Sequence, residues 1–245
     1  MIKAILESYL VQSQLVFLFL SIFAIALGKA GVISPLIGFY TTVLCSFLLV
    51  VVFGVSGVKL LLVASQPESS KVGLMTAMIV GLVPFIVMVA VMSKADFSQP
   101  MIHDITTDLN NPPQFVAAFN ERKSGENSLA YNKGIIEDQL HAYPGVKPLM
   151  SEKSREELFS KALSLIESRG WQLLNVDESQ GIIEAVDETK IFGFKDDVVI
   201  RAVTVDEGHI RIDMRSVSRV GKGDLGANAK RIIHFMDDLR MALSS

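Results

Sequence analysis

The chain has 245 residues, half of them apolar, with a formal net charge of −3 at pH 7 and a mean hydropathy of +0.40. The charges are unevenly distributed, since residues 1–93 contain four basic and two acidic residues whereas residues 94–245 contain 19 basic and 24 acidic residues. This asymmetry excludes an ordinary single soluble domain. A mildly acidic chain without a long basic run also argues against nucleic acid as a partner.

Residues 1–93 are predicted to form a transmembrane region. Three stretches of 21, 29 and 22 residues carry no charge, and a helix needs about 20 apolar residues to cross a bilayer. We predict spans at about residues 11–28, 36–62 and 72–92. A cleavable signal peptide is the competing interpretation of the first stretch, but the N-terminus carries one Lys and one Glu rather than a basic cluster, and two further apolar stretches follow.

The charges next to the predicted spans indicate the orientation of the chain. Lys and Arg are enriched in cytoplasmic loops, and residues 95–121 contain four acidic residues and no Lys or Arg. We therefore expect the C-terminal part to lie outside the cytoplasm, with the lipid bilayer as the partner of the spans. Cys45, the only cysteine, falls inside the second predicted span, so the C-terminal part has no disulfide and no thiolate site.

The C-terminal part is predicted to have an α+β fold. Residues 94–150 are predicted to be an extended connecting segment, because turn-forming residues such as those at 110–113 interrupt it. Residues 151–245 are predicted to form the core, with a helix capped by Ser151 or Ser154 and ended by Gly170, and a last helix at about 225–243. The four strand candidates between these helices are residues 171–176, 181–186, 197–203 and 209–216. This order predicts a four-strand antiparallel sheet packed by two helices.

Charged residues of the predicted strands gather on one face of the sheet. The residues that a period of two places together are Arg201, Arg211, Asp213 and Arg215, with Glu184 from the second strand. One interpretation is a solvated sheet face with cross-strand ion pairs. The other is a surface that binds an anion or a partner.

A candidate anion site lies where the last strand meets the last helix, because guanidinium, hydroxyl and amide groups together suit a phosphate or a carboxylate. Its predicted ligand-binding residues are Arg201, Arg215, Ser216, Ser218, Arg219 and Asn228. The predicted structural residues of this motif are Asp213, Gly221, Asp224 and Gly226. The alternative is that Arg215 and Arg219 pair with aspartates and fix the strand-to-helix corner. The aspartates considered for this role are Asp197, Asp213 and Asp224.

The sequence contains no motif that identifies a reaction. Ser216 or Ser218 with His209 resembles a serine triad in composition only, since no G-x-S-x-G turn is present. The four histidines are scattered, and the pair Asp196 and Asp197 is more typical of a turn than of a weak metal site. We therefore predict no catalytic residue, no metal and no cofactor.

Several ordered segments resemble the domain of unknown function 1499 family. The segments are IHDITTD at 102–108, NPPQF at 111–115, YP at 143–144, TKIFGFKDDVVIR at 189–201 and IDMRSVSRVGKGDLGAN at 212–228. The resemblance covers about residues 100–242 and leaves out the predicted spans. It implies a bacterial, envelope-associated domain that is often joined to membrane spans and has no established reaction.

Together these observations predict a multi-pass protein of the bacterial inner (plasma) membrane with an extracytoplasmic domain. We expect this domain to bind an envelope component, either an anionic lipid head group or a partner protein. The alternative is an enzyme that acts on an anionic envelope substrate through an Arg/Ser/Asn site. An open cleft around the arginines would favour the enzyme, whereas burial of the arginines in ion pairs would favour a scaffold.

Overall fold

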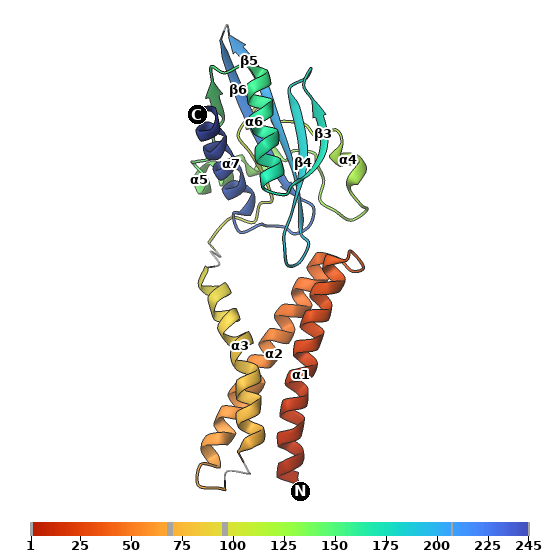
Figure 1. The fold of residues 1–245 in the computed structure, drawn as a ribbon, viewed down its shortest axis with the longest axis vertical. Helices are drawn as coiled ribbons and strands as arrows, with labels where there is room; N and C mark the ends of the chain where they lie inside the picture. The colour runs from red at the N-terminus through yellow and green to blue at the C-terminus, as the bar shows by residue number, and fades with distance from the viewer. Residues whose placement is uncertain (1, 68–70, 95–97, 207, 245) are drawn as a thin grey trace. The chain divides into compact units, whose positions relative to one another are not determined.

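The computed structural model describes residues 2–67, 71–94, 98–206 and 208–244. The chain divides into two compact units, Met1–Ala95 with Lys190–Gly193, and Asp96–Thr189 with Phe194–Ser245. We call the first the helical unit and the second the sheet unit (Figure 1).

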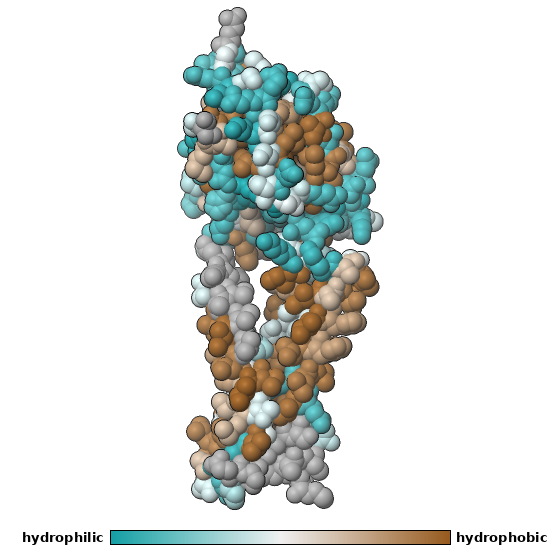
Figure 2. All heavy atoms as spheres, viewed as in Figure 1, coloured by the Kyte–Doolittle hydropathy of each residue, from teal (hydrophilic) through white to brown (hydrophobic). Residues whose placement is uncertain are grey.

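The helical unit consists, in the residues described, of three helices. They are α1 (Ile2–Lys29), α2 (Pro35–Leu62) and α3 (Val72–Lys94). Two stretches, Tyr9–Lys29 of α1 and the whole of α2, are long and apolar enough to cross a membrane, and α3 contains the shorter apolar stretch Val72–Ile86. Hydrophobic residues cover much of the surface of these helices (Figure 2). The prediction of membrane-spanning helices is therefore supported for α1 and α2.

Glycines allow the three helices to pack closely. A Cβ atom at Gly38 of α2 would lie 2.9 Å from the backbone oxygen of Ala24 of α1. A Cβ atom at Gly81 of α3 would lie 2.8 Å from Nε2 of Gln14, which is fully buried in α1. Small residues at such contacts are typical of helices that associate within a membrane.

The sheet unit confirms the predicted α+β class. Its elements are β1 (Asp104–Thr106), α4 (Ala118–Glu121), the 3₁₀ helix η2 (Lys133–Ile135), α5 (Ile136–Ala142), β2 (Leu149–Ser151), α6 (Arg155–Ser168), β3 (Gln172–Asp177), β4 (Ile182–Glu188), β5 (Lys195–Asp206), β6 (His209–Ser218) and α7 (Ala227–Ser244). Ser154 caps α6, because its side chain accepts a hydrogen bond from the backbone N–H of Glu157 at 3.2 Å.

The sheet is antiparallel and has six strands in the residues described, rather than the predicted four. Its order is β1–β6–β5–β4–β3, and β2 also pairs with β6. Strand β1 and the first two residues of β2 come from residues 94–150, for which the sequence predicts little regular structure. The two additional strands form because β6 is ten residues long and one of its edges would otherwise be unpaired. Two strands of three residues each supply hydrogen-bond partners to the backbone groups along that edge. Such short strands show no recognisable period of two.

One face of the sheet carries the main hydrophobic core. Helices α6 and α7 lie on this face (Figure 1), and their buried residues form one cluster with apolar side chains of β4, β5 and β6. Trp171 stacks on Phe235 of α7, with ring centroids 5.6 Å apart. These contacts hold both predicted helices against the predicted strands.

The opposite face of the sheet is also buried, which corrects the expectation of a solvated face. Residues of the segment between β1 and η2 cover it, and a second apolar cluster forms there. The buried members of this cluster are Phe115, Ala118, Leu129, Val199 and Val217. The charged side chains that the strand pattern places on this face are therefore largely enclosed between the sheet and the covering segment.

Candidate functional site

The six predicted ligand-binding residues do not form one cluster, because β6 separates them. The strand continues to Ser218, two residues beyond its predicted end, so its side chains keep alternating between the faces. Ser216 and Ser218 therefore face the helices, where they contact Asn228 of α7. The three residues on the opposite face are Arg201, Arg215 and Arg219.

Arg215 is completely buried and fully engaged. Its Nε lies 2.9 Å from Oδ1 of Asp104 in β1, and its Nη2 lies 2.7 Å from Oδ2 of the same carboxylate. The guanidinium also donates to the backbone oxygens of Pro113 at 3.2 Å and Leu129 at 2.8 Å. A bidentate, charge-assisted pair of this kind fixes both partners in one geometry.

Two aromatic rings enclose the same guanidinium. The central carbon of Arg215 lies 5.2 Å from the ring centroid of Phe115 and 5.3 Å from that of Tyr131, within the range of a cation–π interaction. Burial and the charge of Asp104 raise the pKa of Tyr131 to about 12. An added anion would have to displace either the carboxylate or one of the rings.

Arg201 belongs to a second network, which it shares with Arg211. Its Nη2 lies 3.0 Å from Oδ2 of Asp108 and 2.9 Å from Oδ2 of Asp213. Arg211 contacts the same two carboxylate oxygens at 2.8 and 3.0 Å. Burial acts to raise the pKa of Asp108, but the backbone N–H of Asn111 and the charge of Arg211 outweigh it, so this pKa is lowered.

Arg219 belongs to a third network around the fully buried Asp197. Nη2 of Arg219 lies 2.7 Å from Oδ1 of Asp197, and Nε of Arg122 lies 2.8 Å from Oδ2. The two arginines also donate to the backbone oxygens of Glu121 and Val217. Burial lowers the pKa of Arg122, against the opposing effect of the Asp197 charge. The pairing of Arg219 with Asp197 corresponds to the structural alternative for this arginine.

The polar residues on the helix side form a fourth network. Oγ of Ser216 donates to Oδ1 of Asn228 at 2.6 Å, and Nδ2 of Asn228 donates to Oγ of Ser218 at 2.9 Å. Arg231 of α7 donates to Ser216 and Asn228, and its Nε lies 2.8 Å from Asp187. Two nearby carboxylates raise the pKa of Arg231, outweighing the opposing effect of burial. The sequence gives no role to Arg231 in the candidate site.

Asp224 and the glycines around it hold the turn that leads into α7. Oδ1 of Asp224 accepts from the N–H of Gly226 and Oδ2 accepts from the N–H of Asn228, both at 2.8 Å. Burial raises the pKa of Asp224. Gly221 and Gly226 have φ angles of 97° and 80°, which glycine adopts without strain.

Glu184 is buried on the arginine side of the sheet but serves the backbone rather than an ion pair. Its carboxylate accepts hydrogen bonds from the backbone N–H groups of Val116, Ala117 and Ala118 at 3.0–3.1 Å. These groups lie at the start of α4, so the carboxylate fastens the covering segment to β4. The sequence pattern places Glu184 on the correct face without indicating this role.

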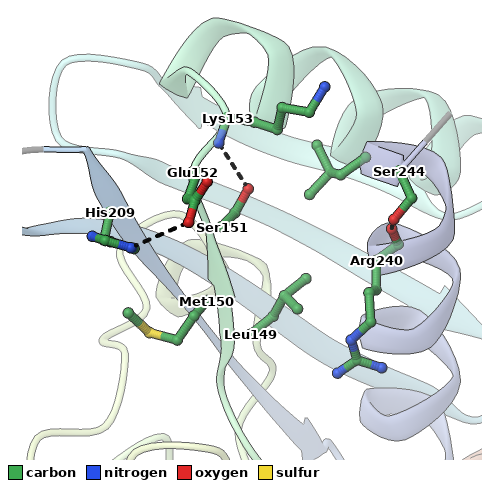
Figure 3. A pocket seen from close by; sticks show the side chains of 9 residues that line it. Leu149, Met150, Ser151, Glu152, Lys153, His209, Arg240 and Ser244 are labelled. Atoms are coloured by element: carbon green, nitrogen blue, oxygen red, sulfur yellow. Dashed lines mark hydrogen bonds and ion pairs between the residues drawn. The ribbon is translucent and has the colours of Figure 1, made fainter.

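Two hollows lie elsewhere on the sheet unit. The first has a volume of 430 Å³, and its lining includes Met150, Glu152, Lys153, His209 and Arg240 (Figure 3). Nδ1 of His209, a lining residue, lies 2.7 Å from Oδ1 of Asp206, which is outside the lining, and this contact raises the pKa of His209. The second has a volume of 730 Å³, and its lining includes Arg169, Trp171, Asp187, Arg231 and Asp238. Neither hollow is lined by a predicted ligand-binding residue.

Within the part of the chain that the structure describes, no group of three His, Cys, Asp or Glu side chains is placed to hold a metal ion. The aspartates considered for a weak metal site are engaged by arginines instead, Asp196 by Arg231 and Asp197 by Arg219. Sequence reasoning also assigns no contact to Asp104 or Arg122, because both lie in the segment predicted to be irregular. The only indication in the sequence that Asp104 is important is its place in the segment at 102–108, which is one of the segments that carry the family resemblance.

A family model described as "Protein of unknown function (DUF1499)" matches residues 104–239. The match includes all four networks and leaves out the helices α1, α2 and α3. No curated protein matches the chain.

Proposed function

The chain belongs to the DUF1499 family, and we propose that it is a membrane-anchored protein whose extracytoplasmic sheet unit binds an envelope component. The component is either a lipid head group or a partner protein. In this proposal the buried arginines build the scaffold that presents a binding surface, and they do not contact the ligand.

The observation that carries this proposal is the closed state of the candidate anion site. Arg201, Arg215 and Arg219 each have a carboxylate partner within 3.0 Å. The hydroxyl groups of Ser216 and Ser218 and the amide of Asn228 bond to one another. A catalytic site for an anionic substrate needs hydrogen-bond donors or cations that are free to meet the substrate. The arrangement therefore supports a scaffold over an enzyme that uses these residues.

Anchoring is supported by the helical unit. Tyr9–Lys29 and Pro35–Leu62 have the length and composition of membrane spans, and we propose α3 as the third span. Three spans would place the two ends of the helical unit on opposite sides of the membrane. The absence of Lys and Arg from residues 95–121, which follow α3, supports an extracytoplasmic position for the sheet unit. We propose the bacterial inner membrane as its location.

A reporter that is active only outside the cytoplasm tests this topology. Fused to the C-terminus, it is expected to be active, and inserted between α2 and α3 it is expected to be inactive. The reverse pattern would contradict the proposed orientation. Equal activity at both positions would contradict a span at α3.

Binding is tested by purifying the full chain from solubilised membranes and analysing the lipids and proteins that accompany it. The matched control is residues 1–95 alone, which contain α1, α2 and α3 and retain the annular lipids of the spans. We expect at least one lipid class or protein to be enriched with the full chain only. Conversion of an added anionic lipid into a new product by the purified chain would instead support the enzyme alternative.

A further inference from the structure

Leu225 combines two features that are unfavourable for an isolated loop. Among the residues described, it is the only non-glycine residue with a positive φ angle, 53°. A leucine in this conformation is strained, because its Cβ atom comes too close to the following carbonyl oxygen. Its side chain is nevertheless 45% exposed, so the strain is not offset by burial of the side chain in the core. Strained residues of this kind cluster at sites where a protein contacts something else.

The backbone around Leu225 is held rigidly. Asp224 accepts hydrogen bonds from the N–H groups of Gly226 and Asn228. On the other side of the loop, Nδ2 of Asn127 donates to the backbone oxygen of Gly221 at 2.8 Å. The exposed leucine is therefore presented by a preformed loop.

A second exposed apolar residue packs against the same loop. A Cβ atom at Gly223 would lie 3.1 Å from both Cα and Sδ of Met101, and Met101 is 69% exposed. Nδ1 of His103 lies 3.2 Å from the backbone oxygen of Lys222, which links the two segments again. The side chain of Lys222 is exposed and makes no ion pair with the part of the chain that the structure describes. We call Met101, Lys222 and Leu225 the docking tip.

The chain itself limits which partner the tip can meet. Met101 follows the last residue of α3, Lys94, by seven residues, and seven residues span at most about 25 Å when fully extended. If α3 crosses the bilayer as proposed above, the tip stays within this reach of a membrane surface. Exposed apolar side chains beside a lysine are the composition of interfacial anchors, where the apolar groups enter the head-group region and the cation meets lipid phosphates.

We propose that the docking tip inserts into the surface of an anionic phospholipid bilayer. This inference rests on the proposed function, because it requires α3 to be a membrane span. It goes further by naming the lipid surface as a ligand of the sheet unit. Leu225 and Met101 supply the apolar contact, and Lys222 supplies the preference for anionic head groups.

The test uses the full chain with Cys45→Ala and one nitroxide attached at Met101→Cys. The protein is reconstituted into vesicles of phosphatidylcholine, alone or mixed with phosphatidylglycerol. Accessibility of the nitroxide to oxygen, which concentrates in the bilayer, is compared with accessibility to a water-soluble nickel complex. The control nitroxide is at Val205→Cys, because Val205 is also an exposed apolar residue and lies in β5. We expect the probe at position 101 to be shielded from nickel in anionic vesicles and the probe at 205 to remain accessible.

Two variants separate docking from folding. Leu225→Asn removes the apolar side chain but suits a positive φ, so the fold is expected to be at least as stable while the probe at 101 regains access to nickel. Lys222→Gln is expected to weaken docking on anionic vesicles about fivefold, which corresponds to about 1 kcal/mol for one basic residue at such a surface. Loss of thermal stability in Leu225→Asn would indicate a structural role and would contradict the proposal.

The remaining outcomes are distinguishable. A chain that resists alkaline extraction from the vesicles but keeps its probe at 101 accessible to nickel would refute docking and leave anchoring intact. A chain that is extracted would refute anchoring itself. Shielding that disappears when the protein is diluted with lipid would show that a second copy covers the tip, and equal shielding on neutral and anionic vesicles would contradict the part assigned to Lys222.

Discussion

Replacing Arg215 by Ala is expected to destabilise the sheet unit strongly. The change leaves the carboxylate of Asp104, whose side chain is only 8% exposed, without its bidentate partner. Removing one member of a buried ion pair costs about 3–5 kcal/mol, because the other charge stays desolvated. Two backbone oxygens, those of Pro113 and Leu129, lose a donor at the same time. The expected loss is therefore at the upper end of that range.

The single tryptophan makes this measurement specific to the sheet unit in the full chain. Trp171 is 8% exposed and stacks on Phe235, so its fluorescence follows unfolding of the core. A loss of this size is expected to lower Tm by about 10 °C or more. Arg240→Ala is the control, because Arg240 is largely exposed and such substitutions usually change stability by less than about 0.5 kcal/mol.

A double variant decides whether the stranded charge is the cause. Asp104→Ala combined with Arg215→Ala leaves no unpaired carboxylate, so it is expected to be more stable than Arg215→Ala alone. The reasoning from the buried pair is refuted if Arg215→Ala has the same Tm as the unaltered chain. It is also refuted if the double variant is no more stable than Arg215→Ala alone. Arg219→Ala is expected to have the smaller effect, because Asp197 keeps a second cation in Arg122.

Two further predictions test the backbone and the pH dependence. Gly181→Ala is expected to lower the stability of the sheet unit more than Gly170→Ala does, as measured by thermal unfolding followed through Trp171 fluorescence. Both glycines have φ near 70°. Only at position 181, however, would a Cβ atom lie 2.3 Å from a backbone oxygen, that of Ala202. The pKa of His209, raised by its contact with Asp206, is expected to lie above 6.5 in an NMR titration. The contribution of this raised pKa to stability is therefore complete below pH 6.5 and is lost as the pH rises through the folded-state value; a stability unchanged across that window would contradict it.

The parts of the fold that could be predicted from the sequence are those with a local signal. Helix α6 has an N-cap serine and an apolar face, and β5 and β6 show a clear alternation of side chains. The strands β1 and β2 could not be predicted, because each has three residues and depends on the edge of β6 for its hydrogen bonds. Their existence follows from tertiary pairing rather than from local preference.

The candidate site could be predicted only in part for the same reason. Period two correctly places Arg201, Arg215 and Glu184 on one face of the sheet. It gives no information on what covers that face, and the partners of Arg215 come from a segment without regular periodicity. Period two already separates Ser216 from Arg215, since both lie in the predicted strand, whereas the place of Ser218 depends on where β6 ends. Two more residues of strand put Ser218 on the face of Ser216.

The buried charges on the arginine side follow from the irregular backbone that covers it. A helix or a strand satisfies its own N–H and C=O groups, whereas an irregular segment buried on a sheet leaves such groups without partners. Here the side chains of the sheet supply those partners. Arg215 donates to the oxygens of Pro113 and Leu129, Arg201 donates to that of Asn111, and Glu184 accepts from three N–H groups at the start of α4.

This role also explains why these side chains are charged rather than neutral. Each arginine has five N–H donors in a planar fork, so one guanidinium can bridge a carboxylate and two carbonyls at once. The backbone carbonyl groups need the N–H donors of the arginines, and the carboxylates neutralise the positive charge that these arginines bring into the interior. The charged residues Asp104 and Asp108 of the segment at 102–108, and Asp213 and Arg215 of the segment at 212–228, are thereby accounted for by the covering of the sheet. A binding function must accordingly be sought in residues that this structural requirement does not explain, and Leu225, strained and exposed beside Met101 and Lys222, is such a residue.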